Sequence, residues 1–169
     1  KKNNKKIILD TSPRVIFIQG LGMFCAGENL KSSRIAQDIA QNNVKIISSI
    51  EETSKFKTIS EKKLFDMEYW SLEQAKIKKQ SQSLAGDVVV ITGGVGTIGL
   101  AACEVFQANG AQVVLMDNNK LEIEKMKKSI KNAFFVCCDV TNKKEIRVAF
   151  RLICSRYGGL DILISNAGL

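Results

Sequence analysis

The stretch Asp87-Val-Val-Val-Ile-Thr-Gly-Gly-Val-Gly-Thr-Ile-Gly99 decides the fold of the second half of this chain. Its continuous apolar run predicts a strand that is buried on both faces. The glycine-rich turn after the run leads directly into apolar residues at helical spacing, from Ile98 to Phe106. Strand, glycine-rich turn and helix in immediate succession predict a parallel sheet with a helix packed on its face.

The sequence beyond the turn continues this alternation. It predicts that Gly110 ends the first helix and that further strands cover residues 111–116, 134–138 and 160–165. Two more helices are expected between these strands, one over residues 119–131 and one capped by Thr141 and stopped at Gly158. The fold class is therefore α/β, a partial doubly wound (Rossmann) parallel sheet. In the strand order 3-2-1-4-5-6, residues 160–165 become an unpaired apolar edge.

The glycine-rich turn also carries a binding motif. Gly94-Val-Gly-Thr-Ile-Gly99 matches G-x-G-x-x-G, which is weak evidence alone and gains strength from the strand before it and the helix after it. Backbone N–H groups of such a turn and the positive end of the helix dipole can bind a pyrophosphate. Asp117 follows at the end of the next strand, where a carboxylate accepts the ribose hydroxyls and repels a 2′-phosphate. The pattern predicts a dinucleotide site that takes NAD rather than NADP.

Residues 84–169 carry four landmarks of one family. Thr92-Gly-Gly-Val-Gly-Thr-Ile-Gly99, Asp117, Cys138-Asp-Val-Thr141 and Ser165-Asn-Ala-Gly168, in this order, resemble the first half of a short-chain dehydrogenase/reductase. The resemblance implies hydride transfer between a nicotinamide cofactor and an alcohol or carbonyl substrate. The residues that the motif and the resemblance together assign to cofactor binding are Thr92, Gly93, Gly94, Gly96, Thr97, Ile98, Gly99, Asp117, Asp139, Val140, Asn166, Ala167 and Gly168.

The same resemblance implies a role for each group. The turn from Gly93 to Gly99 would hold the pyrophosphate, Asp139 and Val140 would contact the adenine, and residues 166–168 would stabilise the sheet and flank the cofactor. Thr97 stands where compact members of the family have a glycine. The spacing of the extended members, T-G-x-x-G-x-x-G, is met instead.

No catalytic residue is assigned. The family places its Ser, Tyr and Lys after the N-A-G segment, and this sequence stops at Leu169. Tyr69 and Tyr157, its two tyrosines, are followed four positions later by Glu73 and Asp161 rather than by lysine. The expectation is a truncated chain that binds NAD weakly and is inactive alone. A downstream polypeptide, or self-association through residues 160–165, would cover the edge strand.

Composition excludes several other functions. The 169 residues include no histidine, which removes imidazole bases and histidine-ligated zinc. Five cysteines without C-x-x-C spacing favour reduced thiols, no metal site and a cytoplasmic protein. No apolar run is long enough to span a membrane. The net charge of +8 rests partly on the tail Lys1 to Lys6, without the arginine and aromatic clusters of a specific nucleic-acid binder.

The first half follows a different pattern. Residues 14–19 predict a buried strand ended by a tight turn at Gly20 and Gly22. Isoleucines at helical spacing over residues 35–50 predict a helix capped by Ser32 or Ser33, and a second helix is expected from near Ser60 through residue 72. Residues 78–83 are predicted to form a polar linker. These few elements cannot close a core, so this half is expected to be the end of a larger domain.

A second resemblance concerns this half. Residues 13–24, 33–36 and 65–76 resemble the stretch that joins the two domains of bifunctional class II aldolase/short-chain dehydrogenases, of the rhamnulose-phosphate aldolase/alcohol dehydrogenase type. It implies that residues 1–83 are the C-terminal remnant of an aldolase-like domain plus a helical linker, and residues 84–169 the N-terminal half of an NAD(P)-binding domain. Two alternatives stay open: a non-catalytic nucleotide-binding or interaction module that adds a partner's strand at residues 160–165, and a basic nucleic-acid binder.

Overall fold

The strands of the second half alternate with helices and form a four-stranded parallel sheet. The computed structural model describes residues 8–9, 11–72 and 82–168. In the sheet, β3 (Val88–Thr92) pairs with β4 (Gln112–Asp117) and β6 (Ile162–Ile164), and β4 pairs with β5 (Ala133–Cys137). The order β5-β4-β3-β6 is the expected 3-2-1-4 arrangement, which confirms the fold class and the place of the last strand at an edge.

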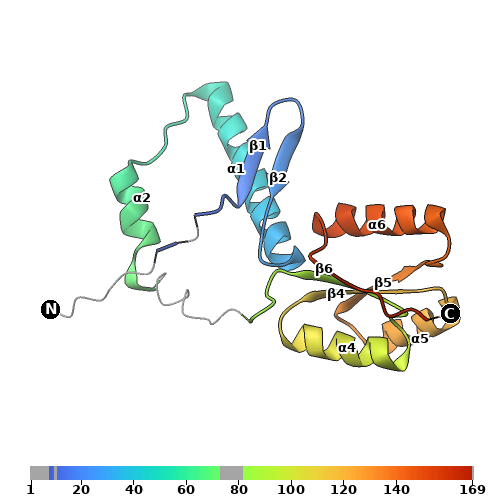
Figure 1. The fold of residues 1–169 in the computed structure, drawn as a ribbon. Helices are drawn as coiled ribbons and strands as arrows, with labels where there is room; N and C mark the ends of the chain where they lie inside the picture. Colours follow the sequence, from blue (N-terminus) through green and yellow to red (C-terminus); the bar gives the residue numbers. More distant parts are fainter. Residues whose placement is uncertain (1–7, 10, 73–81, 169) are drawn as a thin grey trace. The chain divides into compact units, whose positions relative to one another are not determined.

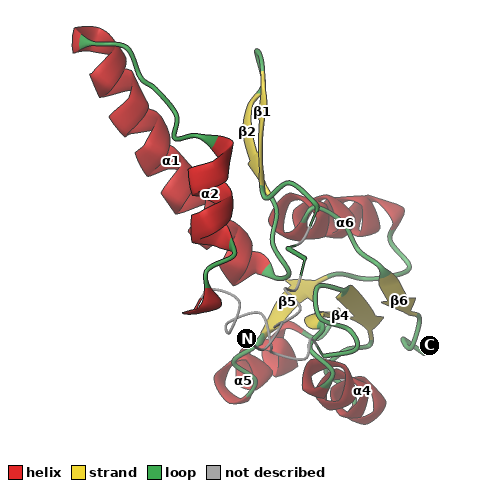
Figure 2. Cartoon of the chain, turned by 90° about the vertical axis from the view of Figure 1, so that its left-hand side faces the viewer, coloured by secondary structure: helices red, strands yellow, loops and turns green. Residues whose placement is uncertain are grey.

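Helices cover both faces of this sheet. Helices α4 (Thr97–Ala108) and α5 (Lys120–Ser129) lie on one side, and α6 (Lys143–Tyr157) lies on the other (Figures 1 and 2). Alternation along β3 separates two cores, because Val88 and Val90 pack with α6 whereas Val89 and Ile91 pack against α4. Every residue of β3 is buried, as its uninterrupted apolar run predicts.

The ends of the helices confirm some expected caps and correct one. Gly110 (φ +94°) follows α4, and Gly158 (φ +86°) ends α6 in the left-handed conformation, both as predicted. The expectation that Thr141 caps α6 was wrong. Asn142 is the N-cap, and its side-chain oxygen accepts the N–H of Lys144 at 3.0 Å. The Thr141 hydroxyl is used elsewhere, in the loop that precedes the helix.

The chain divides into two compact units, residues 1–27 with 31–80 and residues 28–30 with 81–169. In the first unit, β1 (Val15–Ile18) and β2 (Gly22–Cys25) form an antiparallel hairpin. The expected buried strand with a simple turn was therefore wrong in two respects: a second strand follows the turn, and β1 is mostly exposed. Gly20 (φ +80°) and Gly22 (φ +116°) provide the left-handed backbone of the hairpin loop.

The structure describes two helices of eight or more residues in the first unit. Helix α1 (Leu30–Thr53) begins before Ser32 and Ser33, so the predicted caps lie inside it. Helix α2 (Glu61–Glu68) has Ser60 as its N-cap. The predicted helix through residue 72 is interrupted after Glu68, where the N–H of Trp70 bonds the carbonyl of Met67 at 3.2 Å in a tightened turn, and residues 71 and 72 are helical again. Ala40 is the one buried side chain among residues 11–72.

Some expectations fall outside this description. The basic tail over residues 1–6 and most of the linker predicted at 78–83 lie outside the described residues. Within the described residues, no helix combines the length and apolar character that a membrane crossing requires.

Candidate functional site

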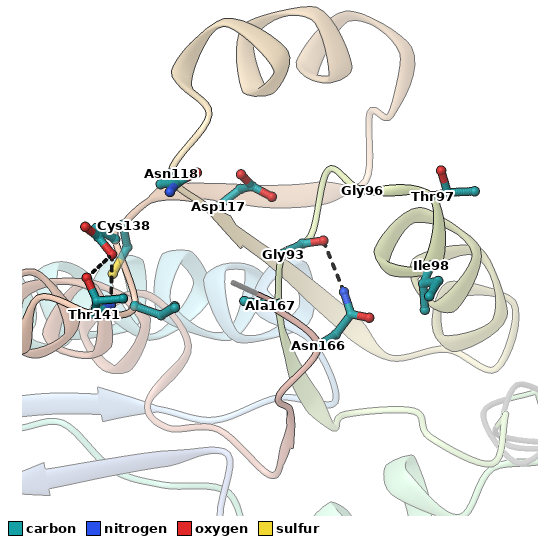
Figure 3. Close-up of a pocket in the computed structure, with 13 residues that line it drawn as sticks. Gly93, Gly96, Thr97, Ile98, Asp117, Asn118, Cys138, Thr141, Asn166 and Ala167 are labelled. Atoms are coloured by element: carbon teal, nitrogen blue, oxygen red, sulfur yellow. Dashed lines mark hydrogen bonds between the residues drawn. The ribbon is translucent and has the colours of Figure 1, made fainter.

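A cleft of about 470 Å³ lies at the carboxyl ends of the parallel strands. This edge of a doubly wound sheet is where ligands bind, at the point where the strand order reverses. Figure 3 shows the glycine turn leading into the first turn of α4, with Asp117 at the end of β4 and Asn166 beyond the end of β6. The cleft is lined by Gly93, Gly96, Thr97, Ile98, Asp117, Asn118, Cys138, Asp139, Val140, Thr141, Asn166, Ala167 and Gly168.

The glycine-rich turn approaches its neighbours too closely for side chains. A Cβ on Gly94 would lie 2.8 Å from the Cβ of Leu115, and a Cβ on Gly99 would lie 2.5 Å from the carbonyl oxygen of Gly93. Gly93 itself has φ +62°, a conformation that suits glycine. Gly94 and Gly99 thus lie beneath the cleft and let the turn pack on β4 and α4.

The N-terminus of α4 opens onto the cleft. Gly96 is the N-cap and has no side chain to accept the N–H groups of the first turn. Thr97 and Ile98, the first two residues of the helix, line the cleft, and Ile98 is 72% exposed. Uncapped N–H groups at a helix N-terminus carry partial positive charge, so this end of the cleft suits an anion.

Asp117 connects the end of β4 to the glycine-rich turn. Its Oδ2 accepts the N–H of Val95 at 3.2 Å, and its Oδ1 accepts the N–H of Asn119 at 2.9 Å. An ionised carboxylate has about four lone-pair sites, so each oxygen can accept one further hydrogen bond. The side chain is therefore held in place and still able to bind hydroxyl groups in the cleft.

The loop between β5 and α6 forms another wall of the cleft, with residues 138–141. Asp139 Oδ1 accepts both the N–H of Thr141 at 2.8 Å and its hydroxyl at 2.7 Å. These bonds lower the pKa of Asp139, which therefore stays ionised. Cys138 is buried next to it, and burial raises the pKa of its thiol, with Glu145 and Asp139 adding to the effect. Cys138 is accordingly an apolar wall residue rather than a reactive thiol.

The segment after β6 is fixed to the end of β3. The hydroxyl oxygen of Thr92 accepts the N–H groups of Asn166 and Ala167 at 3.0 and 3.1 Å. The Asn166 amide in turn donates to the carbonyls of Thr92 and Gly93 at 3.0 and 3.2 Å. These hydrogen bonds set the distance between the ends of β3 and β6, which border the cleft.

The structure brings most of the predicted site residues together. Thr92, Gly94 and Gly99 do not line the cleft; they support it from below. Three lining residues were missing from the predicted set, namely Asn118, Cys138 and Thr141. The sequence could have indicated them by position alone, since each is adjacent to a predicted residue in the segments that follow β4 and β5. That these residues contact a cofactor stays a prediction.

Within the described residues, no group of three or more His, Cys, Asp or Glu side chains could hold a metal ion. The two tyrosines contribute to packing, since Tyr69 stacks on Phe65 with ring centroids 4.5 Å apart and Tyr157 meets Phe134 edge-on at 6.1 Å. Neither tyrosine lines the cleft.

Both halves of the chain match known families. Residues 87–169 match the model of the short chain dehydrogenases, and residues 1–77 match the model of the aldolase class II second domain. An uncharacterized oxidoreductase of Bacillus subtilis, YuxG, is 32% identical over 170 residues, which cover 96% of this chain and 25% of that protein. Short-chain dehydrogenase reductase 3a of Arabidopsis thaliana is 40% identical over 88 residues, covering 51% of this chain and 34% of that protein.

Among solved structures, a 3-ketoacyl-(acyl-carrier-protein) reductase from Brucella melitensis, complexed with NADH, is 32% identical with a TM-score of 0.47, covering 50% of this chain and 35% of that one. The chain thus spans between a quarter and about a third of the length of these relatives.

The fold and the glycine-rich cleft define a nicotinamide-dinucleotide-binding domain of the doubly wound class. Through residues 87–169, the chain belongs to the short-chain dehydrogenase family of oxidoreductases.

Proposed function

We propose that residues 84–169 bind NAD in preference to NADP. The observation that carries this proposal is the charge of the cleft lining: it contains the carboxylates of Asp117 and Asp139 and no lysine or arginine among the residues that line it. A 2′-phosphate needs a cation, whereas ribose hydroxyls need an acceptor. The first turn of α4 supplies the complementary positive end for the pyrophosphate.

The residues of the cleft suit this cofactor in both shape and donor set. The turn from Gly93 to Gly96 leaves the backbone accessible, because it places no side chain beyond Cα between the strand and the helix except Val95. Asp117 would bind the adenosine ribose, and Asp139 with Val140 would contact the adenine. Asn166, Ala167 and Gly168 would flank the other end. When bound, the nicotinamide supplies the hydride chemistry of the family.

The binding proposal is tested with the polypeptide of residues 1–169. Calorimetry should detect NAD at millimolar concentration and a weaker response to NADP. Asp117→Asn should weaken NAD about tenfold, because it replaces a charged acceptor with a neutral one at a cost of about 1.5 kcal/mol. Asp66→Asn, which changes a carboxylate of α2 outside the cleft, should leave the affinity unchanged. The absence of heat with NAD at millimolar concentration would contradict the proposal.

The same polypeptide should not oxidise alcohols at a measurable rate. Its 169 residues contain no Tyr-x-x-x-Lys, so an acid/base pair of the family type is missing from them. The measurement is the absorbance of reduced nicotinamide with a panel of alcohols and aldehydes, against buffer and against heat-treated protein. A rate above both controls that copurifies with the protein would overturn this expectation. Hydride transfer is accordingly proposed for a complete protein of this family, not for these residues alone.

Strand β6 offers a place for a further strand. It pairs with β3 on one side, and no described strand pairs with its other side. Leu163 at its centre is 50% exposed. We propose that this edge is completed by a downstream polypeptide or by a second copy of the chain. The alternative function, a non-catalytic interaction module, uses the same edge and would be favoured by a stable dimer whose melting temperature does not respond to NAD.

We propose that the chain is organised as an aldolase-like remnant and helical linker over residues 1–83, followed by the dinucleotide-binding part over residues 84–169. The match of the first 77 residues to an aldolase class II second domain supports this division.

All five cysteines are free thiols in the structure, which supports a reducing compartment such as the cytoplasm.

A further inference from the structure

The loop between β5 and α6 is held by a side chain that lies outside the cleft. Glu145 is the third residue of α6 and is not among the residues that line the cleft. Its Oε2 accepts the backbone N–H of Asp139 at 2.8 Å, and its Oε1 accepts the side-chain amide of Asn142 at 2.8 Å. One carboxylate therefore connects Asp139, near the start of the loop, to the helix cap Asn142.

Capping of the helix does not by itself require this arrangement. Helix α5 has the same two residue types at the same positions, with Asn119 as the N-cap and Glu122 three residues later. The Asn119 side chain accepts the N–H of Glu122 at 3.1 Å, but the Glu122 carboxylate turns to Lys125 at 3.0 Å. Glu145 differs because it reaches out of its helix to the preceding loop.

The loop is fastened from the other side as well. Asp139 Oδ1 accepts both donors of Thr141, so the backbone conformation of residues 139–141 is fixed by bonds at both ends. Asp139, Val140 and Thr141 all line the cleft. A change at Glu145 is therefore transmitted to three lining residues without removing any of them.

We propose that Glu145 is a positioning residue for the adenine end of the cofactor, acting through the backbone of Asp139. This inference rests on the proposed function, and it deepens that proposal by naming a residue that neither the motif nor the cleft lining contains. Loss of the carboxylate frees the N–H of Asp139 and lets the loop sample other conformations. Part of the binding energy is then spent on ordering it.

The test compares Glu145→Ala, Glu145→Gln and Glu122→Ala in the chain of residues 1–169. Glu145→Ala should accelerate amide hydrogen exchange at Asp139 and weaken NAD and ADP-ribose equally, by about threefold, which is the low end of the range for one hydrogen bond because this bond is exposed. Glu145→Gln should restore most of both measurements, because its amide oxygen can still accept the N–H of Asp139, although its NH2 group cannot accept the Asn142 amide. Glu122→Ala removes the matched carboxylate of α5 and should change neither.

Three results would overturn the inference. Unchanged exchange at Asp139 in Glu145→Ala would show that the bond does not hold the loop. Faster exchange with unchanged affinity would show that holding the loop does not position the cofactor. An equal loss of affinity in Glu122→Ala would reduce the effect to helix stability. Failure of the proposed function would look different: the unmodified chain would bind neither nucleotide, while exchange at Asp139 would still respond to Glu145→Ala.

Discussion

Replacing Gly99 with alanine is expected to lower the free energy of unfolding of the dinucleotide-binding unit by about 3 kcal/mol. The new Cβ would lie 2.5 Å from the carbonyl oxygen of Gly93 and 2.9 Å from the Cα of Gly94. Both are backbone atoms, so no side-chain rotation can relieve the overlap. The turn must instead move away from α4, and this shift would also displace the N–H groups that face the cleft.

Urea denaturation followed by far-ultraviolet circular dichroism measures this loss. Gly159→Ala is the matched control, since its Cβ would meet no heavy atom within 4 Å. Its backbone is not in the left-handed region, and the change should stay within about 0.5 kcal/mol. Equal stability of the two variants would show that the close approach of α4 to the turn is absent. A folded Gly99→Ala chain should in addition bind NAD more weakly than Gly159→Ala.

The sheet could be predicted from the sequence because its strands are buried on both faces. Residues 88–91 have no polar position, and such a run fits a central parallel strand between two helical layers. The order of the strands followed from connection rules that apply to any doubly wound fold. Strand and helix bounds differed by a few residues, and β6 is shorter than the run over residues 160–165 predicts.

The caps were harder to predict because several residue types can form them. Thr141 and Asn142 are adjacent and both are suitable N-caps. The choice between them depends on Asp139, which binds the Thr141 hydroxyl and leaves Asn142 to cap the helix. The hairpin of the first unit was missed for a different reason. β1 and β2 have four residues each, and their sequences Val-Ile-Phe-Ile and Gly-Met-Phe-Cys show no alternation of apolar and polar residues.

The site was predicted in its motif and only partly in its geometry. A motif marks residues that are adjacent in sequence, whereas the wall of a cleft is formed where separate strand ends meet. Asn118 lines the cleft for this reason although no motif contains it, and Thr141 lines it although the resemblance assigned it no contact with the cofactor. Conversely, Gly94 belongs to the motif because the backbone packs tightly there, with Leu115 close beneath it, and it does not face the cleft.

Thr92 is the second position where a small change should have a large effect. Thr92→Val keeps the shape of the side chain and removes the oxygen that accepts the N–H groups of Asn166 and Ala167. It also removes the hydroxyl that donates to the carbonyl of Ile164 at 3.4 Å. Thr92 is 8% exposed and its hydrogen bonds to Asn166 and Ala167 are partly buried, so the loss of both should lower the free energy of unfolding by about 2 kcal/mol.

Thr92→Ser separates the hydroxyl from the methyl group. It keeps both accepted hydrogen bonds and should cost about 1 kcal/mol for the loss of one buried methyl. Urea denaturation measures the free energy of unfolding of both variants. A larger decrease in Thr92→Ser than in Thr92→Val would show that packing of the methyl group, not hydrogen bonding, holds β6 at the end of β3. Since Asn166 and Ala167 line the cleft, Thr92→Val should also weaken NAD binding while Thr92→Ser preserves it. A stable Thr92→Val chain with unchanged affinity would mean that the segment after β6 does not set the width of the cleft.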